Sequence, residues 1–588
     1  MDLSTRDGRR ILGDRIKRAA KEAGFSLDDL AVRIGCSRAL IYQYASGASL
    51  AQPDRLQQIA LVVGKSLASF FEETESHRAA ADAAVGSESQ GEPPVRERAP
   101  YLRELVDAYS NAPDWRHVAD TCQQLIALLD NDTASEELAR YLFTHGNALL
   151  RLHEFGHAKT KLEEAGAMYR TLGMTAESLD CLQSIGSAEV HLGHTGQAMA
   201  AFRRVADGAD WHHRWQGVLA IGAVHEMLGD YSATSDALLR AQEIIGENKE
   251  ARVTDAAYLY VDGNWANLEL AWGDYDRALE TAHRCVAGAQ RLGDQDQYIE
   301  ALLNCAAARL GLGQLREASV DAQGAVNVAE LVRDHERWSL GLASRSLATG
   351  SIVDAKESLS IALRYNCRRA ELLAQKAIAN AYLTSENLVE ARYHVEQAIA
   401  TAELGVLKLP LVEFRLLDAV IAHAEGSVDV AGELAERCFA DATKLQAKQA
   451  RHDAALLLAQ IAAKAAEWDV VISYATISST LAREMNADWQ IWRSESLRAR
   501  ALARNGSIDE VGDALAAAVR SIEVHRSQGH DMLGDTLPEL DAVKETWLEW
   551  FFYLESVGRN NDAVEFRDRA DWQPLAAWIE ERRNAEQE

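Results

Sequence analysis

The 588-residue sequence is poor in cysteine and proline and has no long hydrophobic run. Its seven cysteines are scattered without a C-x-x-C pair, which argues against a disulfide framework and against a cysteine-rich metal site. No apolar stretch is long enough to span a bilayer, and the first residues lack the apolar core of a secretion signal. We therefore expect a cytoplasmic protein without membrane association.

Proline and strand signals are scarce over most of the chain. Four of the eight prolines lie beyond Pro100, and that region has almost no alternating or hairpin pattern. The sequence therefore predicts an all-α protein. Its length exceeds what one hydrophobic core usually organises, so we expect a small domain and a larger helical body.

Basic residues are scarce outside the N-terminal segment. Residues 1–73 hold 11 Lys and Arg against 9 Asp and Glu, which leaves a formal charge of −30 for the remainder. Because neutralisation of phosphates dominates nucleic-acid affinity, the acidic remainder is a poor polyanion-binding surface. Only the N-terminal segment suits such a partner.

Sequence patterns of catalysis are also missing. Gly64-Lys65-Ser66 ends like a phosphate-binding loop, but Ile59 stands where the leading glycine belongs. The metalloprotease, serine hydrolase and dinucleotide-binding patterns do not occur. We expect no enzymatic activity, no cofactor and no metal.

Residues 24–47 predict two short helices joined by a glycine turn. Ser26 is placed to cap the first helix, whose apolar residues Leu30 and Ile34 share one face, and Gly35 ends it. Ser37 caps the second helix, which turns Leu40, Ile41 and Tyr44 inward. This arrangement is typical of a helix laid into the major groove of DNA.

The spacing of residues 24–47 resembles the Cro/repressor-type helix-turn-helix family, also called the Xre family, and the resemblance extends from about Arg9 to Phe71. It implies a small five-helix domain over residues 1–73 that binds two-fold symmetric operators as a dimer. Leu27 departs from the pattern, because family members often have a phosphate-contacting glutamine there. A domain kept only for protein docking is the alternative. The DNA-reading positions that the resemblance implies are Ser37, Arg38, Ala39, Tyr42 and Gln43.

Residues 74–100 contain little to bury and end in proline, so we expect a flexible linker. Residues 101–588 repeat a turn at a period of about 40 residues, which is best seen at Trp272–Ala278. Such a period indicates about twelve stacked helix pairs in an α-solenoid. The aligned turn positions are Gly193, Gly229, Gly273, Gly313, Gly350, Glu386, Gly426, Ala466, Gly506 and Gly558, with weaker copies at Pro113 and His153.

The C-terminal end of the repeats carries a dense apolar run, Trp547, Trp550 and Phe551–Tyr553. We expect a terminal cap near residues 540–588 with this run in its core. A dimer contact is the alternative.

The repeats resemble the tetratricopeptide family, although the period exceeds the usual 34 residues and the closing proline is missing. In that family a small residue lets the paired helices approach, and an alanine opens the second helix. The small positions here hold Gly146, Gly186 and Gly222, and the alanine positions hold Ala198, Ala278, Ala318, Ala355, Ala391 and Ala563.

The tetratricopeptide resemblance also implies a binding groove on the first helix of each pair. In the family, asparagines six and nine residues before the turn glycine hold the backbone of an extended peptide, since an amide both donates and accepts. The matching residues are Asn147, Asn267 and Asn380 at the first position and Asn264 and Asn304 at the second. Solvated asparagines without a ligand are the alternative.

Together, the two regions resemble the RRNPP group of bacterial quorum-sensing regulators, in which repeats couple a peptide signal to DNA binding. The resemblance implies a sequence-specific transcription regulator, dimeric, with a palindromic operator and a peptide or protein ligand in the repeat groove. The alternative is a scaffold that recruits a protein partner to DNA without such a signal.

Overall fold

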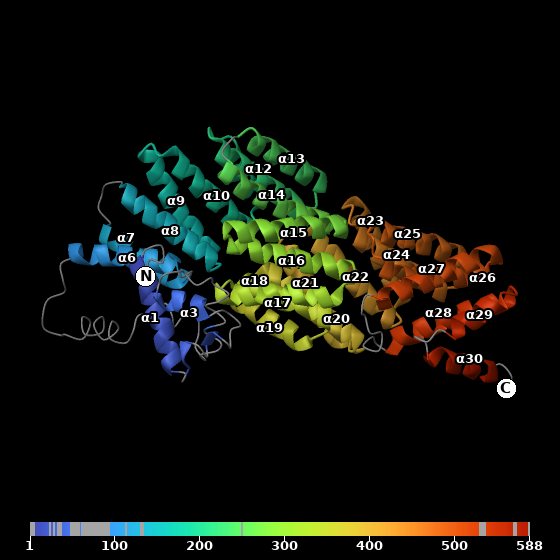
Figure 1. Cartoon of the computed structure of the whole chain (residues 1–588). Helices are drawn as coiled ribbons and strands as arrows, with labels where there is room; N and C mark the ends of the chain where they lie inside the picture. Colours follow the sequence, from blue (N-terminus) through green and yellow to red (C-terminus); the bar gives the residue numbers. More distant parts are fainter. Residues whose placement is uncertain are drawn as a thin grey trace. The chain divides into compact units, whose positions relative to one another are not determined.

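The computed structural model describes residues 6–22, 25–27, 30–31, 38–46, 59, 95–111, 114–129, 135–248, 251–527, 537–568 and 573–585. Every regular element in these ranges is a helix (Figure 1). The all-α prediction is therefore confirmed for the described residues. The chain divides into two compact units, residues 1–173 with 331–333 and residues 174–330 with 334–588.

The N-terminal part of the first unit contains α1 (Arg6–Glu22) and α3 (Arg38–Ser46), which pack against each other. Ile16 and Ile41 are fully buried between them. Gly13 permits the close approach, because a Cβ there would lie 2.6 Å from backbone oxygen atoms at the end of α3. The rest of the expected five-helix domain lies almost entirely outside the described residues.

Four further helices complete the first unit: α6 (Val95–Asn111), α7 (Trp115–Leu129), α8 (Glu136–Arg151) and α9 (Phe155–Thr171). Consecutive helices pack against one another around a shared cluster of buried apolar side chains. Helix α6 begins inside the segment that the sequence marks as a linker, so residues 95–100 are helical. The rest of that segment lies outside the described residues.

The second unit is a succession of helix pairs, in which helices that follow one another along the chain pack together. Ten of the helices in these pairs are 17 residues long, and short turns separate most neighbours. The pairs are α10 (Thr175–His191) with α11 (Thr195–Ala206), α12 (Trp211–Met227) with α13 (Tyr231–Gly246), α14 (Ala251–Trp272) with α15 (Tyr275–Leu292), α16 (Gln295–Gly311) with α17 (Leu315–Leu331), α18 (His335–Thr349) with α19 (Ile352–Arg364), α20 (Arg368–Thr384) with α21 (Leu388–Leu404), α22 (Lys408–Ala424) with α23 (Val428–Lys444), α24 (Lys448–Lys464) with α25 (Trp468–Glu484), and α26 (Ile491–Arg504) with α27 (Ile508–Ser527), the last preceded by the short 3-10 helix η2 (Asp488–Gln490).

The turn inside each helix pair has one residue with left-handed backbone. This residue has φ between 71° and 83° where it is glycine, from Gly193 to Gly558. The same conformation occurs at His153, Glu386 and Ala466, with φ of 59°, 57° and 60°. These are the turn positions on which the sequence repeats align, so the predicted helix-pair period is confirmed in the described residues.

The small and alanine positions of the repeats are explained by packing inside each pair. A Cβ on Gly146 would lie 2.6 Å from Cγ of Leu162, and one on Gly186 would meet the ring of Phe202. The alanines that open the second helices, from Ala198 to Ala563, are at most 1% exposed. Larger residues at either position would force the two helices apart.

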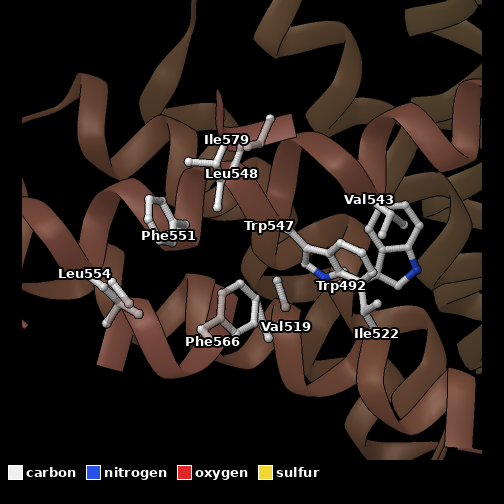
Figure 2. Packing of buried hydrophobic residues seen from close by; sticks show 12 residues of the cluster. Trp492, Val519, Ile522, Val543, Trp547, Leu548, Phe551, Leu554, Phe566 and Ile579 are labelled. Carbon is white, nitrogen blue, oxygen red and sulfur yellow. The ribbon is translucent and has the colours of Figure 1, made fainter. Parts of the chain in front are cut away.

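The repeats end in α28 (Leu537–Ser556), α29 (Asn560–Arg567) and α30 (Gln573–Ala585). Trp547 and Phe551 are 4% and 1% exposed and join a cluster with side chains of α26 and α27 (Figure 2). Trp550 and Phe552 pack against the same cluster while partly buried. The C-terminal aromatic run therefore contributes to the core of the last pairs.

Residues far apart in the sequence of the second unit meet where successive superhelical turns touch. The turn of the α14–α15 pair touches the start of α24, where Nζ of Lys448 lies 2.6 Å from Oδ1 of Asp274. The turn after α16 likewise meets η2, since Nε1 of Trp489 donates to the Gly311 carbonyl at 2.9 Å. We call this contact between successive superhelical turns the seam. Its residues are 191–193, 228–231, 272–276 and 311–313 on one edge, and 368, 404–408, 445–449 and 485–490 on the other.

Candidate functional site

The predicted DNA-reading residues lie on or next to α3. Arg38, Ala39 and Gln43 belong to this helix, whereas Ser37 lies outside the described residues. Tyr42 is 52% exposed, while its neighbour Ile41 is fully buried and Tyr44 is 5% exposed. Helix α3 therefore has one face in the core and another face, marked by Tyr42, open to solvent.

The five predicted groove asparagines all lie on the first helix of a pair, but the structure groups only three of them. Asn264 and Asn267 are on α14 and Asn304 is on α16, and these two helices pack against each other. Asn380 is on α20, further along the second unit, and Asn147 is on α8 of the first unit.

The three neighbouring asparagines have different surroundings. The Asn264 amide donates to the Tyr260 carbonyl at 2.9 Å, and Asn267 is half-buried. Asn304 is 3% exposed, and its Nδ2 finds no hydrogen-bond partner in the part of the chain that the structure describes. Because a buried donor without a partner costs about 1–3 kcal/mol, Asn304 is the most unusual of the predicted residues.

A set of charged residues on the first helices was not anticipated from the sequence. Glu300 on α16 accepts from two arginines, at 3.1 Å from Nε of Arg337 and at 2.8 Å from Nη1 of Arg369. Burial by itself would raise the pKa of Glu300, but the two guanidinium groups outweigh it and hold the pKa at about 2. The Glu300 carboxylate is thus ionised at any physiological pH and links α16, α18 and α20.

Glu226 on α12 is enclosed near the same group. Burial raises the pKa of Glu226 to about 7, with Arg369 opposing this shift and the Glu300 charge adding to it. On the next first helices, Nζ of Lys376 of α20 lies 2.9 Å from Oε2 of Glu413 of α22. Oppositely charged side chains thus pair between first helices of the second unit, and we call this set of residues the charged wall.

Part of the charged wall follows a pattern in the sequence that only an alignment of the repeats reveals. Glu300, Arg337, Glu413 and Asp453 each stand thirteen residues before the turn residue of their repeat. Successive pairs hold Glu300, Arg337, Leu373, Glu413 and Asp453 at this register, so the position shows no fixed residue or charge and is noticed only when the repeats are aligned. Only the structure brings opposite charges at this register together.

Residues 16–70 match the protein-family model described as helix-turn-helix. This match includes α3, with its buried Ile41 and exposed Tyr42. The chain carries an N-terminal helix-turn-helix domain. No curated relative of the chain was found.

Solved structures similar to this chain include two of Rap proteins. The complex of a Rap protein with competence and sporulation factor shares 12% identity over 66% of this chain and 98% of its own, with a TM-score of 0.41. The Rap conjugation gene regulator of plasmid pLS20, in complex with the Phr* peptide, shares 16% identity over 67% and 97% of the two chains, with a TM-score of 0.34.

Outside the helix-turn-helix domain, the histidine-rich start of α12 is held by carboxylates. Buried His213 contacts Oδ2 of Asp210 at 2.6 Å and Oδ1 of Asp180 at 3.1 Å. Burial lowers the pKa of His213, but the two carboxylates outweigh it and leave the pKa raised. The described residues contain no group of three or more His, Cys, Asp or Glu side chains suited to a metal ion. Nor do they include a helix long and apolar enough to cross a membrane.

Proposed function

We propose that the protein is a transcription regulator in which the helix-turn-helix domain reads a specific duplex sequence and the repeats take a peptide or protein partner. The match over residues 16–70 carries this proposal. The sequence assigns residues 1–73 to the reader, and the strongly acidic remainder opposes phosphate. In this proposal only the small N-terminal domain contacts DNA. The helical repeats of residues 101–588 bind the other partner.

Helix α3 supplies the reading residues in this proposal. Arg38 makes a bidentate contact to guanine and Gln43 one to adenine, and each contact discriminates by roughly 1–3 kcal/mol. Ser37, Ala39 and Tyr42 contact the backbone or base edges beside them. Two copies of the chain bind a palindromic operator as a homodimer, because half-sites for such helices lie about one helical turn apart.

The partner binds along the first helices of the repeats, with Asn264, Asn267 and Asn304 as its central contacts. An extended peptide offers both donors and acceptors to side-chain amides, and the buried unpaired Nδ2 of Asn304 is a donor in need of an acceptor. Asn147 and Asn380 extend the contact along the array. The charged wall beside these residues favours a partner that carries charges of its own.

Selection of bound duplexes from a random pool by the full-length protein tests the reader. We expect a palindromic site, and we expect Arg38→Ala with Gln43→Ala to weaken binding to that site roughly 30-fold or more, since two base contacts are lost. Arg18→Ala on the exposed side of α1 is the charge-matched control and should retain the sequence preference. An unchanged operator preference in the double variant would remove α3 as the reader.

Selection from a random peptide library displayed on phage tests the groove. We expect the full-length protein to enrich a family of peptides, and Asn264→Ala with Asn267→Ala to abolish that enrichment. Asn327→Ala on α17, outside the first helices, is the control. If no peptide is enriched and the full chain instead retains one stoichiometric protein from extract, the scaffold function replaces the sensor.

A further inference from the structure

A cavity of about 240 Å³ lies near the C-terminal end of the repeats, between α27, α28 and α29. Each of the three helices contributes one face to it. The lining residues of α27 stand at helical spacing within residues 516–523, and those of α28 are Trp550 and Leu554, four residues apart. The cavity is therefore formed by the packing of three helices and not by a loop.

The short helix α29 forms one side of this cavity. It has eight residues, whereas the second helices of the preceding pairs in the second unit have 12 to 20. Helix α29 ends at Arg567, directly after Phe566, which lines the cavity. The space beside the second half of α27 thus lies where the last second helix stops early.

The inner part of the cavity is apolar. Val519, Leu554 and Phe566 line it and are 5%, 1% and 6% exposed. All three belong to the buried cluster at the end of the repeats, in which Val519 and Phe566 lie next to each other (Figure 2). We call these three side chains the apolar floor. An apolar group of a ligand would leave water when it packs against this floor.

Charged side chains of both signs surround the apolar floor. Arg559 and Asp562 neutralise each other, since Nε of Arg559 lies 2.5 Å from Oδ2 of Asp562. Arg520 of α27 and Glu565 of α29 are exposed, and neither has a hydrogen bond or ion pair within the described part of the chain. The cavity therefore offers one unpaired guanidinium group and one unpaired carboxylate, on two different helices.

We propose that this cavity binds a free amino acid with an apolar side chain. The α-carboxylate of the ligand accepts from the Arg520 guanidinium, its ammonium group donates to the Glu565 carboxylate, and its side chain packs against the apolar floor. The size agrees, because 240 Å³ is below the roughly 300–1,000 Å³ of sites for drug-sized molecules. A zwitterion also matches a lining with two arginines and three acidic residues, which has no large excess of either charge.

Titration calorimetry of the full-length protein with L-leucine and with L-phenylalanine tests the site. We expect at least one of the two to bind, at about one molecule per chain. The matching carboxylic acid without the ammonium group, such as 4-methylpentanoate for leucine, should bind about tenfold more weakly. The amide, such as leucinamide, should do the same, because each analogue leaves one charged group of the protein unpaired.

Substitutions in the lining locate the bound amino acid. We expect Arg520→Gln and Glu565→Gln each to weaken binding about tenfold, and Ala516→Phe to abolish it by filling the cavity. Arg504→Gln and Glu510→Gln are the matched controls, since both residues are exposed and lie outside the lining. If Ala516→Phe does not fold, the two surface substitutions still decide the question.

Three outcomes overturn the amino-acid site. The first is no binding of either amino acid, and the second is unchanged affinity in both glutamine variants, which would place the ligand elsewhere. The third is a dimer that Ala516→Phe converts to a monomer in sedimentation velocity, which would mean that a side chain of a second copy fills the cavity. None of these measurements uses DNA or a peptide, so a failure here is distinct from a failure of the proposed function.

Discussion

The turns inside the helix pairs of the second unit fall into two sets that differ in what covers them. Those at Gly193, Gly229, Gly273 and Gly313 lie in the seam and all carry glycine. The later turns lie on an edge where a Cβ on Gly350, Gly426 or Gly506 would meet no atom within 4 Å. That second set also includes Glu386 and Ala466, at φ of 57° and 60°.

The comparison separates two reasons for glycine at a turn. Left-handed backbone costs an ordinary residue about 1–2 kcal/mol, which the open turns at Glu386 and Ala466 tolerate. At Gly229, Gly273 and Gly313 a Cβ would also lie 2.4, 2.9 and 2.7 Å from a side chain of the next superhelical turn, whereas at Gly193 it would make an ordinary contact at 3.5 Å. Conformation favours glycine in both sets, and packing demands it only in the seam.

The largest expected effect comes from a methyl group placed in the seam. We expect Gly313→Ala to lower the local free energy of opening by about 3 kcal/mol, because backbone strain adds to a clash with the Trp489 ring 2.7 Å from the new Cβ. Gly426→Ala has the same backbone strain in open space and should cost only about 1 kcal/mol. Native-state hydrogen exchange at the two turns measures both changes in the free energy of opening. Equal changes for the two substitutions would show that contacts in the seam do not restrict a side chain at Gly313.

Burial of Glu226 near the charged wall makes the stability of the fold depend on pH. Since the pKa of Glu226 is raised to about 7 from 4.5, the folded protein holds this proton more tightly than the unfolded chain and loses stability as pH rises from 5 to 8. We expect Glu226→Gln to be more stable than the parent by about 1–3 kcal/mol at pH 8 and by less than about 1 kcal/mol at pH 5, since the loss begins at the unfolded pKa of 4.5.

Urea unfolding of both proteins at the two pH values measures the effect of Glu226. Glu433→Gln on the exposed face of α23 is the control, which should follow the parent at each pH. A stability gain for Glu226→Gln that is the same at pH 5 and pH 8 would mean that the pKa of Glu226 is not raised in the folded protein.

The smallest effect is expected at an open turn without glycine. Ala466→Gly relieves the left-handed strain but increases the freedom of the unfolded chain, so we expect a net gain of about 0.5 kcal/mol. Hydrogen exchange near α25 should slow slightly. Faster exchange would show that a side chain at this turn contributes contacts that outweigh its strain.

Sequence reasoning found the elements that depend on local chemistry. The turn positions from Gly193 to Gly558 were located by their period, and each has the left-handed backbone that glycine favours. Positions such as Gly186 and Ala278 were assigned by their place in the repeat, and both are packed inside a helix pair. The inward residues Ile41 and Tyr44 of α3 were likewise predicted from helical spacing. The ligand roles of the five asparagines and of the reading residues stay predictions.

The sequence by itself determined the helices, their turns and the packing within each pair, because these depend on residues a few positions to one repeat apart. Only the tertiary structure decided the seam and the charged wall. Asp274 and Lys448 are 174 residues apart, and no local pattern marks either residue as a partner. Their meeting depends on the accumulated rotation from one helix pair to the next, which is the sum of many small packing choices rather than the property of any one repeat.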